Sequence, residues 1–159
     1  SLRELGAATP AGWFPNGVDL DFFAPGAAPH RPAALCFIGR MDYFPNQQAM
    51  TAFCRDVLPL VRARRPDATL SIIGAEPPAD IRALGKLPGV ICTGTVPDVR
   101  PFAQGAVASI APLRIARGTQ NKILEAMAMG LPVLCSSRAA AGVEATDGEH
   151  LLVADAPAD

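Results

Sequence analysis

Short runs of apolar residues alternate along this chain with longer segments in which apolar residues recur every three or four positions. The short runs have the length and composition of parallel β-strands that are buried on both faces. Most of them lie next to a glycine or a proline, which favours a turn at that point. We therefore expect six strands, at residues 34–39, 69–74, 89–94, 107–112, 131–135 and 150–154.

The segments between these runs predict helices. The apolar face of the first, residues 46–65, holds Met50, Phe53, Val57 and either Leu60 or Val61. Asn46 is a good N-cap for this helix, and Pro66 ends the pattern. Further helices are expected at residues 78–84, 99–104 and 120–129. In the last of these the predicted apolar face consists of Ile123, Leu124, Met127 and Ala128.

Strands that alternate with helices indicate right-handed βα units and a parallel sheet with helices on both faces. The predicted fold class is therefore α/β, a doubly wound and mostly parallel sheet. In such folds the ligand binds beyond the carboxyl ends of the strands, beside the point where the strand order reverses.

The first 32 residues differ from the rest in composition. They are rich in proline, glycine and alanine and show no sustained periodicity, which is typical of a linker. We interpret residues 1–32 as a lead-in from another domain and residues 33–159 as one α/β domain. The absence of an initiating Met leads us to expect that the chain is an excised piece.

Composition narrows the possible functions. Half of the 159 residues are hydrophobic, which excludes a disordered tail. The formal net charge is -1, so a nucleic-acid partner is not expected. No apolar run approaches the roughly 20 residues of a membrane span, and no signal peptide is visible, which favours the cytoplasm. The four cysteines are far apart and lack nearby histidines, so we expect buried thiols, no disulfides and no metal site.

Candidate chemistry lies where the predicted strands end. Arg40 follows the first strand, and its guanidinium suits phosphate oxygens. Residues 118–122 open a helix, so free backbone N–H groups and the Lys122 ammonium can converge on an anion. Glu125 lies on the same face, placed to accept hydrogen bonds from sugar hydroxyls. The alternatives are a solvated arginine, a surface lysine and a plain ion pair between Lys122 and Glu125.

Other familiar motifs are missing. The chain has no G-x-G-x-x-G after its first strand, no P-loop and no G-x-S-x-G, which disfavours a dinucleotide site, a P-loop kinase and a serine hydrolase. Asp19 and Asp21 have the D-x-D form of a metal site, but they lie in the lead-in, before the sheet begins.

The motifs of this sequence resemble those of the group 1 (family 4) retaining glycosyltransferases. The matching segments are NGVD at residues 16–19, FAP at 23–25, FIGR at 37–40 and GTQNKILEAMAMGLPV at 118–133. YFPN at residues 43–46 and the G-T-x-x-K pattern at 118–122 are more narrowly similar to bacterial sugar transferases of exopolysaccharide gene clusters, including the PEP-CTERM/EpsH-associated set.

The resemblance implies a GT-B architecture, in which two Rossmann-like domains face a cleft. The N-terminal domain of that architecture binds the acceptor, and the C-terminal domain binds a nucleotide-diphospho-sugar donor. This chain resembles the donor domain, truncated at both ends, with the segment before residue 33 as the interdomain linker. On this interpretation the isolated chain is expected to bind donor without transferring the sugar.

The resemblance also assigns roles to residues. Arg40 would hold the donor diphosphate, with Lys122 as the second positive charge because Pro45 stands where the family has a lysine. Glu125 matches the second acid of the E-x7-E motif, which contacts the ribose, whereas Arg117 replaces the first. The remaining expected donor-site residues are Gly39, Gly118 and Thr119, and, at the base, Thr95, Val96 and Pro97. No metal or further cofactor is expected, since cations and a helix N-terminus can stabilise the leaving diphosphate.

The implied partners are a nucleotide-sugar donor, an N-terminal acceptor domain of the same polypeptide and a saccharide or lipid-linked acceptor. The missing domain would also allow peripheral contact with the inner membrane face. Two other functions stay open. One is an epimerase-like enzyme that keeps its nucleotide sugar, and the other is a non-catalytic regulatory α/β domain. The second would require acids clustered after the first strand, where the sequence has Arg40 and only Asp42.

Overall fold

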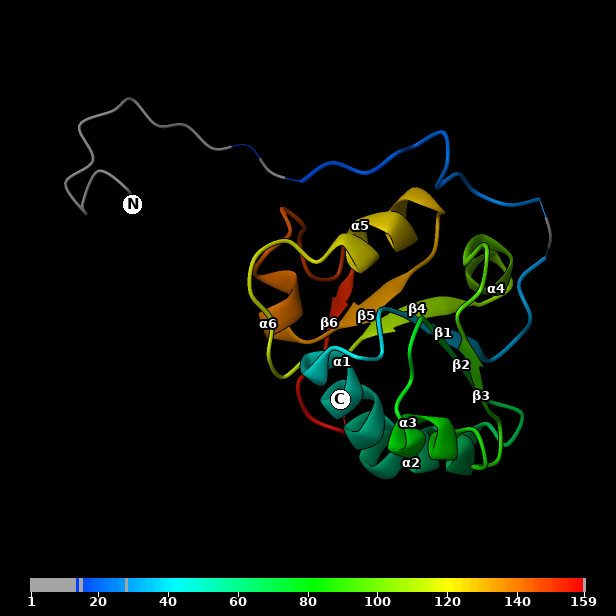
Figure 1. Ribbon diagram of the computed structural model, residues 1–159. Coiled ribbons are helices and arrows are strands. Elements are labelled where there is room, and N and C mark those ends of the chain that lie inside the picture. The colour runs from blue at the N-terminus through cyan, green and yellow to red at the C-terminus, as the bar shows by residue number, and fades with distance from the viewer. Residues whose placement is uncertain (1–13, 15, 28, 159) are drawn as a thin grey trace.

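In the computed structural model, which describes residues 14, 16–27 and 29–158, six parallel strands form one sheet in the order β3-β2-β1-β4-β5-β6 (Figure 1). The strands are β1 (Ala34–Ile38), β2 (Thr69–Ile73), β3 (Val90–Gly94), β4 (Ala108–Ala111), β5 (Val133–Cys135) and β6 (Leu152–Val153). Each lies within a predicted apolar run, and the predicted doubly wound α/β fold is confirmed. The strand order reverses between β1 and β4, so ligand binding is expected at that point.

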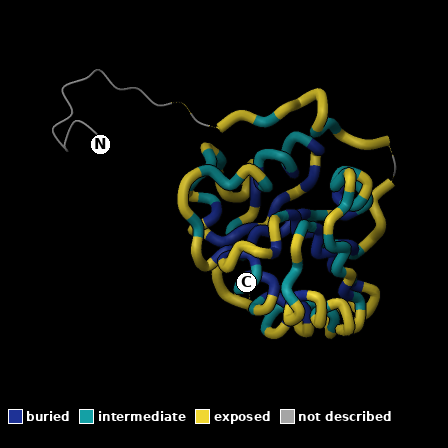
Figure 2. Tube along the Cα trace, in the orientation of Figure 1, coloured by how far each residue is buried: buried dark blue, intermediate teal, exposed yellow. Residues whose placement is uncertain are grey.

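Strand pairing places distant segments in register. Phe37 of β1 pairs with Ile72 of β2, and Leu35 of β1 pairs with Ala108 of β4. The buried residues concentrate along the sheet between the helices (Figure 2). Phe37, Ile72 and Ile110 are almost fully buried, which explains why the strands read as continuous apolar runs.

The helical segment after β1 departs from the prediction in two ways. It consists of α1 (Phe44–Ala52), a π-helical turn η1 (Phe53–Val57) and α2 (Leu58–Arg64). The N-cap is Tyr43, so the prediction that Asn46 caps this helix was wrong. The π turn lies directly before Pro59, and in it the Leu58 N–H bonds to the Phe53 carbonyl. Pro59 has no N–H to donate, and in a regular α-helix its ring would crowd the carbonyl one turn back.

The remaining helices are α3 (Ala79–Leu84), α4 (Arg100–Gln104), α5 (Asn121–Ala128) and α6 (Ser137–Ala140). The first three match predictions, and α6, which was not predicted, is capped by the Ser136 side chain. The apolar face of α5 was partly wrong, because Ile123 and Ala126 are its buried residues. Figure 1 shows α1, α2 and α3 on one face of the sheet and α4 and α5 on the other. Among the residues that the structure describes, no helix has both the length and the hydropathy of a membrane span.

All four cysteines are free thiols, and Cys36, Cys54 and Cys135 are buried as predicted, whereas Cys92 is only partly buried. Burial raises the pKa of each of these three thiols to about 11, so they stay protonated at neutral pH and behave as small apolar side chains.

The described part of the lead-in lies against the helical layer that contains α4. The Arg100 guanidinium donates to the Phe22 carbonyl and lies 3.9 Å from the centre of the Phe22 ring. Gln104 donates to the Ala24 carbonyl at 2.7 Å. These contacts hold the lead-in on the domain although it contains no helix or strand in its described residues.

The chain segments that leave β1 and β2 stay close together. The Gly39 N–H donates to the Ile73 carbonyl and the Met41 N–H to the Ala75 carbonyl, so the pairing of the two strands continues past their ends. Gly74 makes this approach possible, because a Cβ atom at residue 74 would overlap the Gly39 carbonyl oxygen. The approach brings the residues that follow β1 and β2 side by side.

We predict that Gly74→Ala destabilises the fold by about 3 kcal/mol or more, since a backbone clash cannot be relieved by turning a side chain. Gly17→Ala is the matched control, because nothing lies within 4 Å of an added Cβ there and its change should stay within about 0.5 kcal/mol. Urea unfolding of both variants measures the difference. Equal stability of the two variants would contradict the close approach.

Candidate functional site

A cavity of about 530 Å³ opens where the strand order reverses. Its walls come from the end of β1, the start of α1 and the start of α5, which follows β4. It is lined by Ile38, Gly39, Arg40, Asp42, Tyr43, Asn46, Thr119, Asn121, Lys122 and Glu125. The cavity thus occupies the place where doubly wound sheets bind their ligands, and it contains five of the predicted site residues, namely Gly39, Arg40, Thr119, Lys122 and Glu125.

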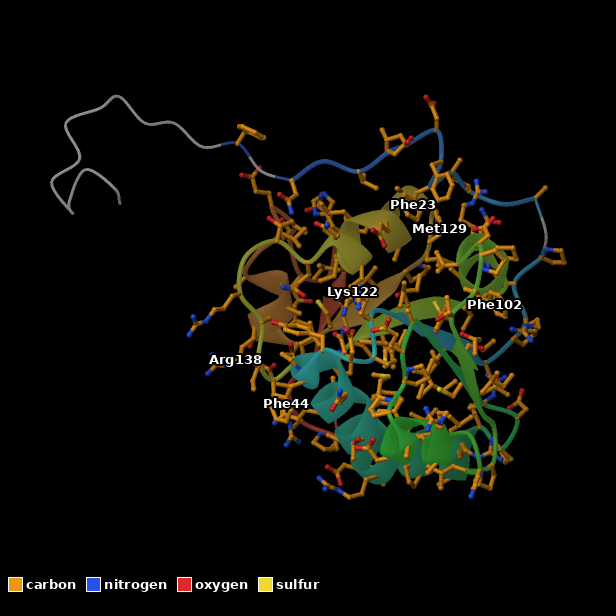
Figure 3. All side chains as sticks on the ribbon, viewed as in Figure 1. Phe23, Phe44, Phe102, Lys122, Met129 and Arg138 are labelled. Carbon is orange, nitrogen blue, oxygen red and sulfur yellow. The ribbon has the colours of Figure 1, made fainter. Side chains whose placement is uncertain are left out.

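The Lys122 ammonium is the central charge of this cavity. Lys122 is the second residue of α5, and its side chain points between α5 and the start of α1 (Figure 3). Its Nζ donates a 2.7 Å hydrogen bond to Asn46 Oδ1 and lies 4.4 Å from the centre of the Phe37 ring. Burial lowers the Lys122 pKa to about 8, a change that Glu125 opposes. The ammonium is therefore largely charged at neutral pH but poorly solvated, so an anion beside it would be stabilised.

The start of α5 adds to the positive potential. Its N-cap, Gln120, makes no capping hydrogen bond through its side chain, and the first turn carries no acidic residue. Uncapped N–H groups at the start of a helix are equivalent to a partial positive charge and favour bound anions. This end of α5 and the Lys122 ammonium act on the same cavity.

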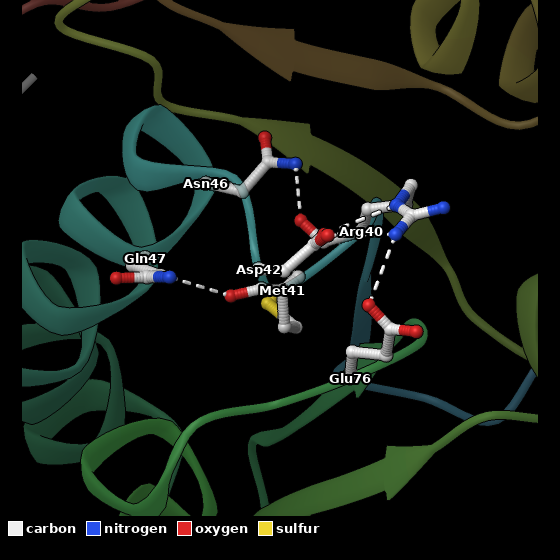
Figure 4. A network of polar contacts seen from close by, with 6 residues as sticks. All are labelled: Arg40, Met41, Asp42, Asn46, Gln47 and Glu76. Carbon is white, nitrogen blue, oxygen red and sulfur yellow. Dashed lines mark hydrogen bonds and ion pairs between the residues drawn. The ribbon is translucent and has the colours of Figure 1, made fainter.

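Arg40 lines the cavity but is already paired with two carboxylates (Figure 4). Its Nε and Nη2 donate to the two Asp42 oxygens at 3.0 and 2.6 Å, and Nη2 also donates to Glu76 Oε2 at 3.0 Å. The hydrogen bonds from Arg40 lower the pKa of the Asp42 carboxyl. The side chain is exposed and its Nη1 has no partner among the described residues, so a phosphate group can bind there, whereas at Nε or Nη2 it would exchange one charge-assisted contact for another.

Glu76 reaches Arg40 through an unusual backbone conformation. Its φ angle is +55°, in the left-handed region that residues other than glycine rarely adopt. The conformation directs its carboxylate across the β1–β2 boundary. The contact of Glu76 with Arg40 was not predicted from the sequence.

Glu125 lies one turn further along α5 than Lys122. Burial raises the pKa of this carboxyl, and the Lys122 ammonium opposes the rise. The carboxyl lines the cavity beyond the ammonium, which suits a hydrogen-bond acceptor for hydroxyl groups of a ligand whose charged part contacts Lys122.

Four of the predicted site residues do not line the cavity. Thr95, Val96 and Pro97 follow β3, which is separated from β1 by β2, and Gly118 lies outside the lining as well. Gly118 has a φ of +63°, and its carbonyl closely approaches Gly142, so in this structure it shapes the loop that leads to α5.

Asn46 is the principal cavity residue whose position sequence reasoning missed. The sequence predicts a helix cap at this residue, but Asn46 lies in the third position of α1 and is 5% exposed. Its spacing of three, four and seven residues from Ala49, Met50 and Phe53 places it on the buried face of the helix. That spacing was the signal available in the sequence.

The D-x-D pair has a local structural role. Asp19 Oδ1 accepts hydrogen bonds from the backbone N–H groups of Asp21 and Phe22, at 3.0 and 2.9 Å. This is the usual behaviour of an aspartate that stabilises a turn.

A second cavity, of about 370 Å³, lies on the other side of α1. It is lined largely by apolar residues such as Phe53, Ile110 and Leu134, with Arg114 and Arg138 among its polar residues. Both arginines are exposed, and Arg114 lies 3.9 Å from Asp56. The cavity contains no counterpart of the half-buried Lys122 ammonium, so we assign anion chemistry to the first cavity.

Comparison with known proteins gives one family match. Residues 32–159 match the family described as Glycosyl transferases group 1. The curated proteins include no significant match to this sequence.

Several solved structures share the fold. The C-terminal domain of the glycosyl transferase group 1 family protein LpcC from Francisella tularensis is 18% identical, with a TM-score of 0.66 over 88% of this chain and 80% of that one. Anabaena Alr3699/HepE in complex with UDP and glucose is 14% identical, with a TM-score of 0.64 over 89% of this chain and 42% of that one. The pneumococcal O-GlcNAc transferase GtfA in complex with UDP and GlcNAc is 12% identical, with a TM-score of 0.58 over 72% and 22%. This chain therefore spans less than half the length of the last two.

The lowered pKa of Lys122 predicts a pH-dependent stability. Between about pH 8 and 10.5 the unfolded chain keeps a proton on Lys122 that the folded chain has lost, so the contribution of Lys122 to the free energy of unfolding rises with pH in that window. Lys122→Met should lack this rise. Urea unfolding across the window should show the wild type gaining about 3 kcal/mol relative to the variant. Parallel pH profiles would show that Lys122 titrates as an ordinary lysine.

Proposed function

This chain belongs to the group 1 glycosyl transferase family, and on that premise we propose that its cavity binds the diphosphate of a nucleotide-sugar donor. The observation that carries the proposal is the Lys122 ammonium, half-buried at the start of α5. Its one hydrogen-bond partner among the described residues is the neutral amide of Asn46. A poorly solvated cation that is hydrogen-bonded to a neutral amide rather than to a carboxylate is suited to a ligand that brings negative charge.

The proposed chemistry follows from where charge develops. Breaking the bond between a sugar and a diphosphate leaves negative charge on the departing nucleoside diphosphate. Lys122, the start of α5 and Arg40 would stabilise that charge, which is the general role of preorganised donors around a developing anion. We propose that these groups suffice and that no metal or further cofactor takes part.

Other parts of the donor are assigned more coarsely. Glu125 would accept hydrogen bonds from the ribose hydroxyls, next to the diphosphate on Lys122. Thr95, Val96 and Pro97 remain the proposed contact for the base, although they lie outside the cavity. The structures of HepE and GtfA contain UDP, which makes UDP the first nucleotide to test here.

The transfer itself is proposed at the level of the whole protein. The acceptor would be a saccharide or a lipid-linked saccharide, bound with the help of a further domain, and the isolated chain would then bind donor without transfer. Retention of anomeric configuration, a role in bacterial exopolysaccharide synthesis and a cytoplasmic location are parts of the same proposal. The first two of these derive from the motif resemblance at residues 37–46 and 118–133.

The proposal predicts that nucleoside diphosphates stabilise the fold and that the corresponding nucleosides do so much less. Lys122, Arg40 and the start of α5 all act on the diphosphate. At 100 times its dissociation constant the ligand should add about 2.7 kcal/mol to the free energy of unfolding. Thermal unfolding with UDP, GDP and ADP against their nucleosides tests this. Equal effects of nucleoside and diphosphate would remove the phosphate site, and stabilisation only by magnesium with acetyl phosphate would favour a regulatory domain.

Two substitutions separate the diphosphate from the ribose. Lys122→Ala should weaken diphosphate binding by about 1–3 kcal/mol through loss of a charge-assisted contact. Glu125→Gln should instead reduce the preference for ribose over 2′-deoxyribose diphosphates, because it changes the acceptor for the hydroxyls. Calorimetric titration with both ligand types measures the two effects. The same loss of preference in both variants would show that Glu125 is structural.

A further inference from the structure

Asn46 connects the two basic residues of the cavity. Its Nδ2 donates to the Arg40 carbonyl at 2.8 Å (Figure 4), and its Oδ1 accepts from Lys122 Nζ at 2.7 Å. A carbonyl can only accept and an ammonium can only donate, so the two partners fix the orientation of the amide. An asparagine that is 5% exposed thus joins the segment after β1 to the first turn of α5.

The junction is closely packed around Gly39. A Cβ atom at residue 39 would lie 2.8 Å from Asn46 Nδ2 and 3.0 Å from Lys122 Nζ. Because Gly39 has no side chain, the amide and the ammonium can both reach the end of β1. The position of Nζ is therefore determined by packing as well as by its hydrogen bond.

The charged and titratable groups around Lys122 lie on or next to four elements. Glu125 lies on α5, Arg40 and Asp42 follow β1, and Tyr43 caps α1. Glu76, which follows β2, is held on Arg40. Among these groups Asp42 and Glu76 are engaged with Arg40, so within the described residues the hydrogen-bonded neighbour of the ammonium is the Asn46 amide.

We propose that Asn46 is a positioning residue for diphosphate binding, which holds the Lys122 ammonium in the cavity and keeps its charge available to the ligand. This inference rests on the proposed function. The ammonium has three N–H groups, and Asn46 uses one, so two remain for phosphate oxygens. The neutrality of the amide is essential, because a carboxylate at residue 46 would neutralise the charge that the diphosphate needs.

The neutral amide also influences protonation. Burial holds the Lys122 pKa at about 8, and a hydrogen bond from the ammonium to Oδ1 favours the charged form. Removing that acceptor should lower the Lys122 pKa by about one unit, and replacing it with a carboxylate should raise the pKa. A residue that only supported the fold would not shift the pH dependence of binding in opposite directions.

The experiment is calorimetric titration of UDP, from about two pH units below the Lys122 pKa of about 8 to about two units above it, so that shifted midpoints stay inside the range. Wild-type affinity should fall as the pH rises through this range. Asn46→Leu should weaken binding by about tenfold or more on the acid side and move the midpoint to lower pH. Asn46→Asp should also weaken binding but should move the midpoint to higher pH.

Two control variants isolate the effect. Gln47→Ala removes a 2.8 Å hydrogen bond to the Met41 carbonyl, an equivalent contact from the next residue of α1 that does not reach Lys122. It should leave the midpoint unchanged. Lys122→Met should give a profile without this midpoint. Any pH dependence that remains in this variant then measures the contribution of the nucleotide's own ionisation. Circular dichroism establishes that each variant is folded, and Asn46→Ser replaces Asn46→Leu if the latter does not fold.

The outcomes distinguish this inference from the proposed function. If the wild type binds no nucleoside diphosphate, the proposed function fails, and this inference fails with it. If the wild type binds and the Asn46 variants keep its midpoint, the inference alone is overturned, whether or not their affinity falls. Opposite shifts of the midpoint in Asn46→Leu and Asn46→Asp, with none in Gln47→Ala, would establish the positioning role.

Discussion

A positive charge held against an aromatic ring is the constraint on which this edge of the sheet depends. The Lys122 ammonium lies 4.4 Å from the Phe37 ring centre, in a position where burial lowers its pKa to about 8. A cation in such a place needs a hydrogen-bond acceptor that does not neutralise it. The surrounding chain provides one in Asn46 and leaves room for it at Gly39.

The two basic residues of the cavity differ in their surroundings. Arg40 is exposed and carries hydrogen bonds to Asp42 and Glu76, whereas Lys122 is half-buried and bonded to a neutral amide. An arriving diphosphate would gain the Lys122 contact outright, whereas at Arg40 only Nη1 is free among the described contacts and the Nε and Nη2 groups are already bonded to carboxylates. Lys122 is therefore expected to contribute the larger part of the affinity. Arg40 would add a contact whose net value is reduced wherever it replaces a carboxylate.

Much of the fold could be predicted from the sequence because the sheet is buried on both faces. A strand such as Ala34–Ile38 then appears as an unbroken apolar run, and a helix such as Asn121–Ala128 is recognised by its spacing. The π-helical turn at Phe53–Val57 could not be predicted, because an apolar pattern does not show how a chain accommodates Pro59.

The cavity was only partly predictable. Arg40, Lys122 and Glu125 were found because strand ends and helix starts indicate where a ligand binds. The partners of these residues depend on contacts across the fold. Glu76 is 36 residues from Arg40 in sequence, and Asn46 is 76 residues from Lys122, so no local pattern connects them. Thr95 follows β3, which β2 separates from β1, so the proposed contact for the base lies outside this cavity.

The central claim is that the diphosphate binds at the junction of β1 and α5. Its most direct test is a ¹H–¹⁵N NMR titration of the chain with UDP, with backbone amide shifts followed residue by residue. The account predicts that the largest shifts occur at Gly39, Asn121 and Lys122, with smaller ones along α1. Shifts confined to the second cavity, around Phe53, Leu134 and Arg138, would contradict it.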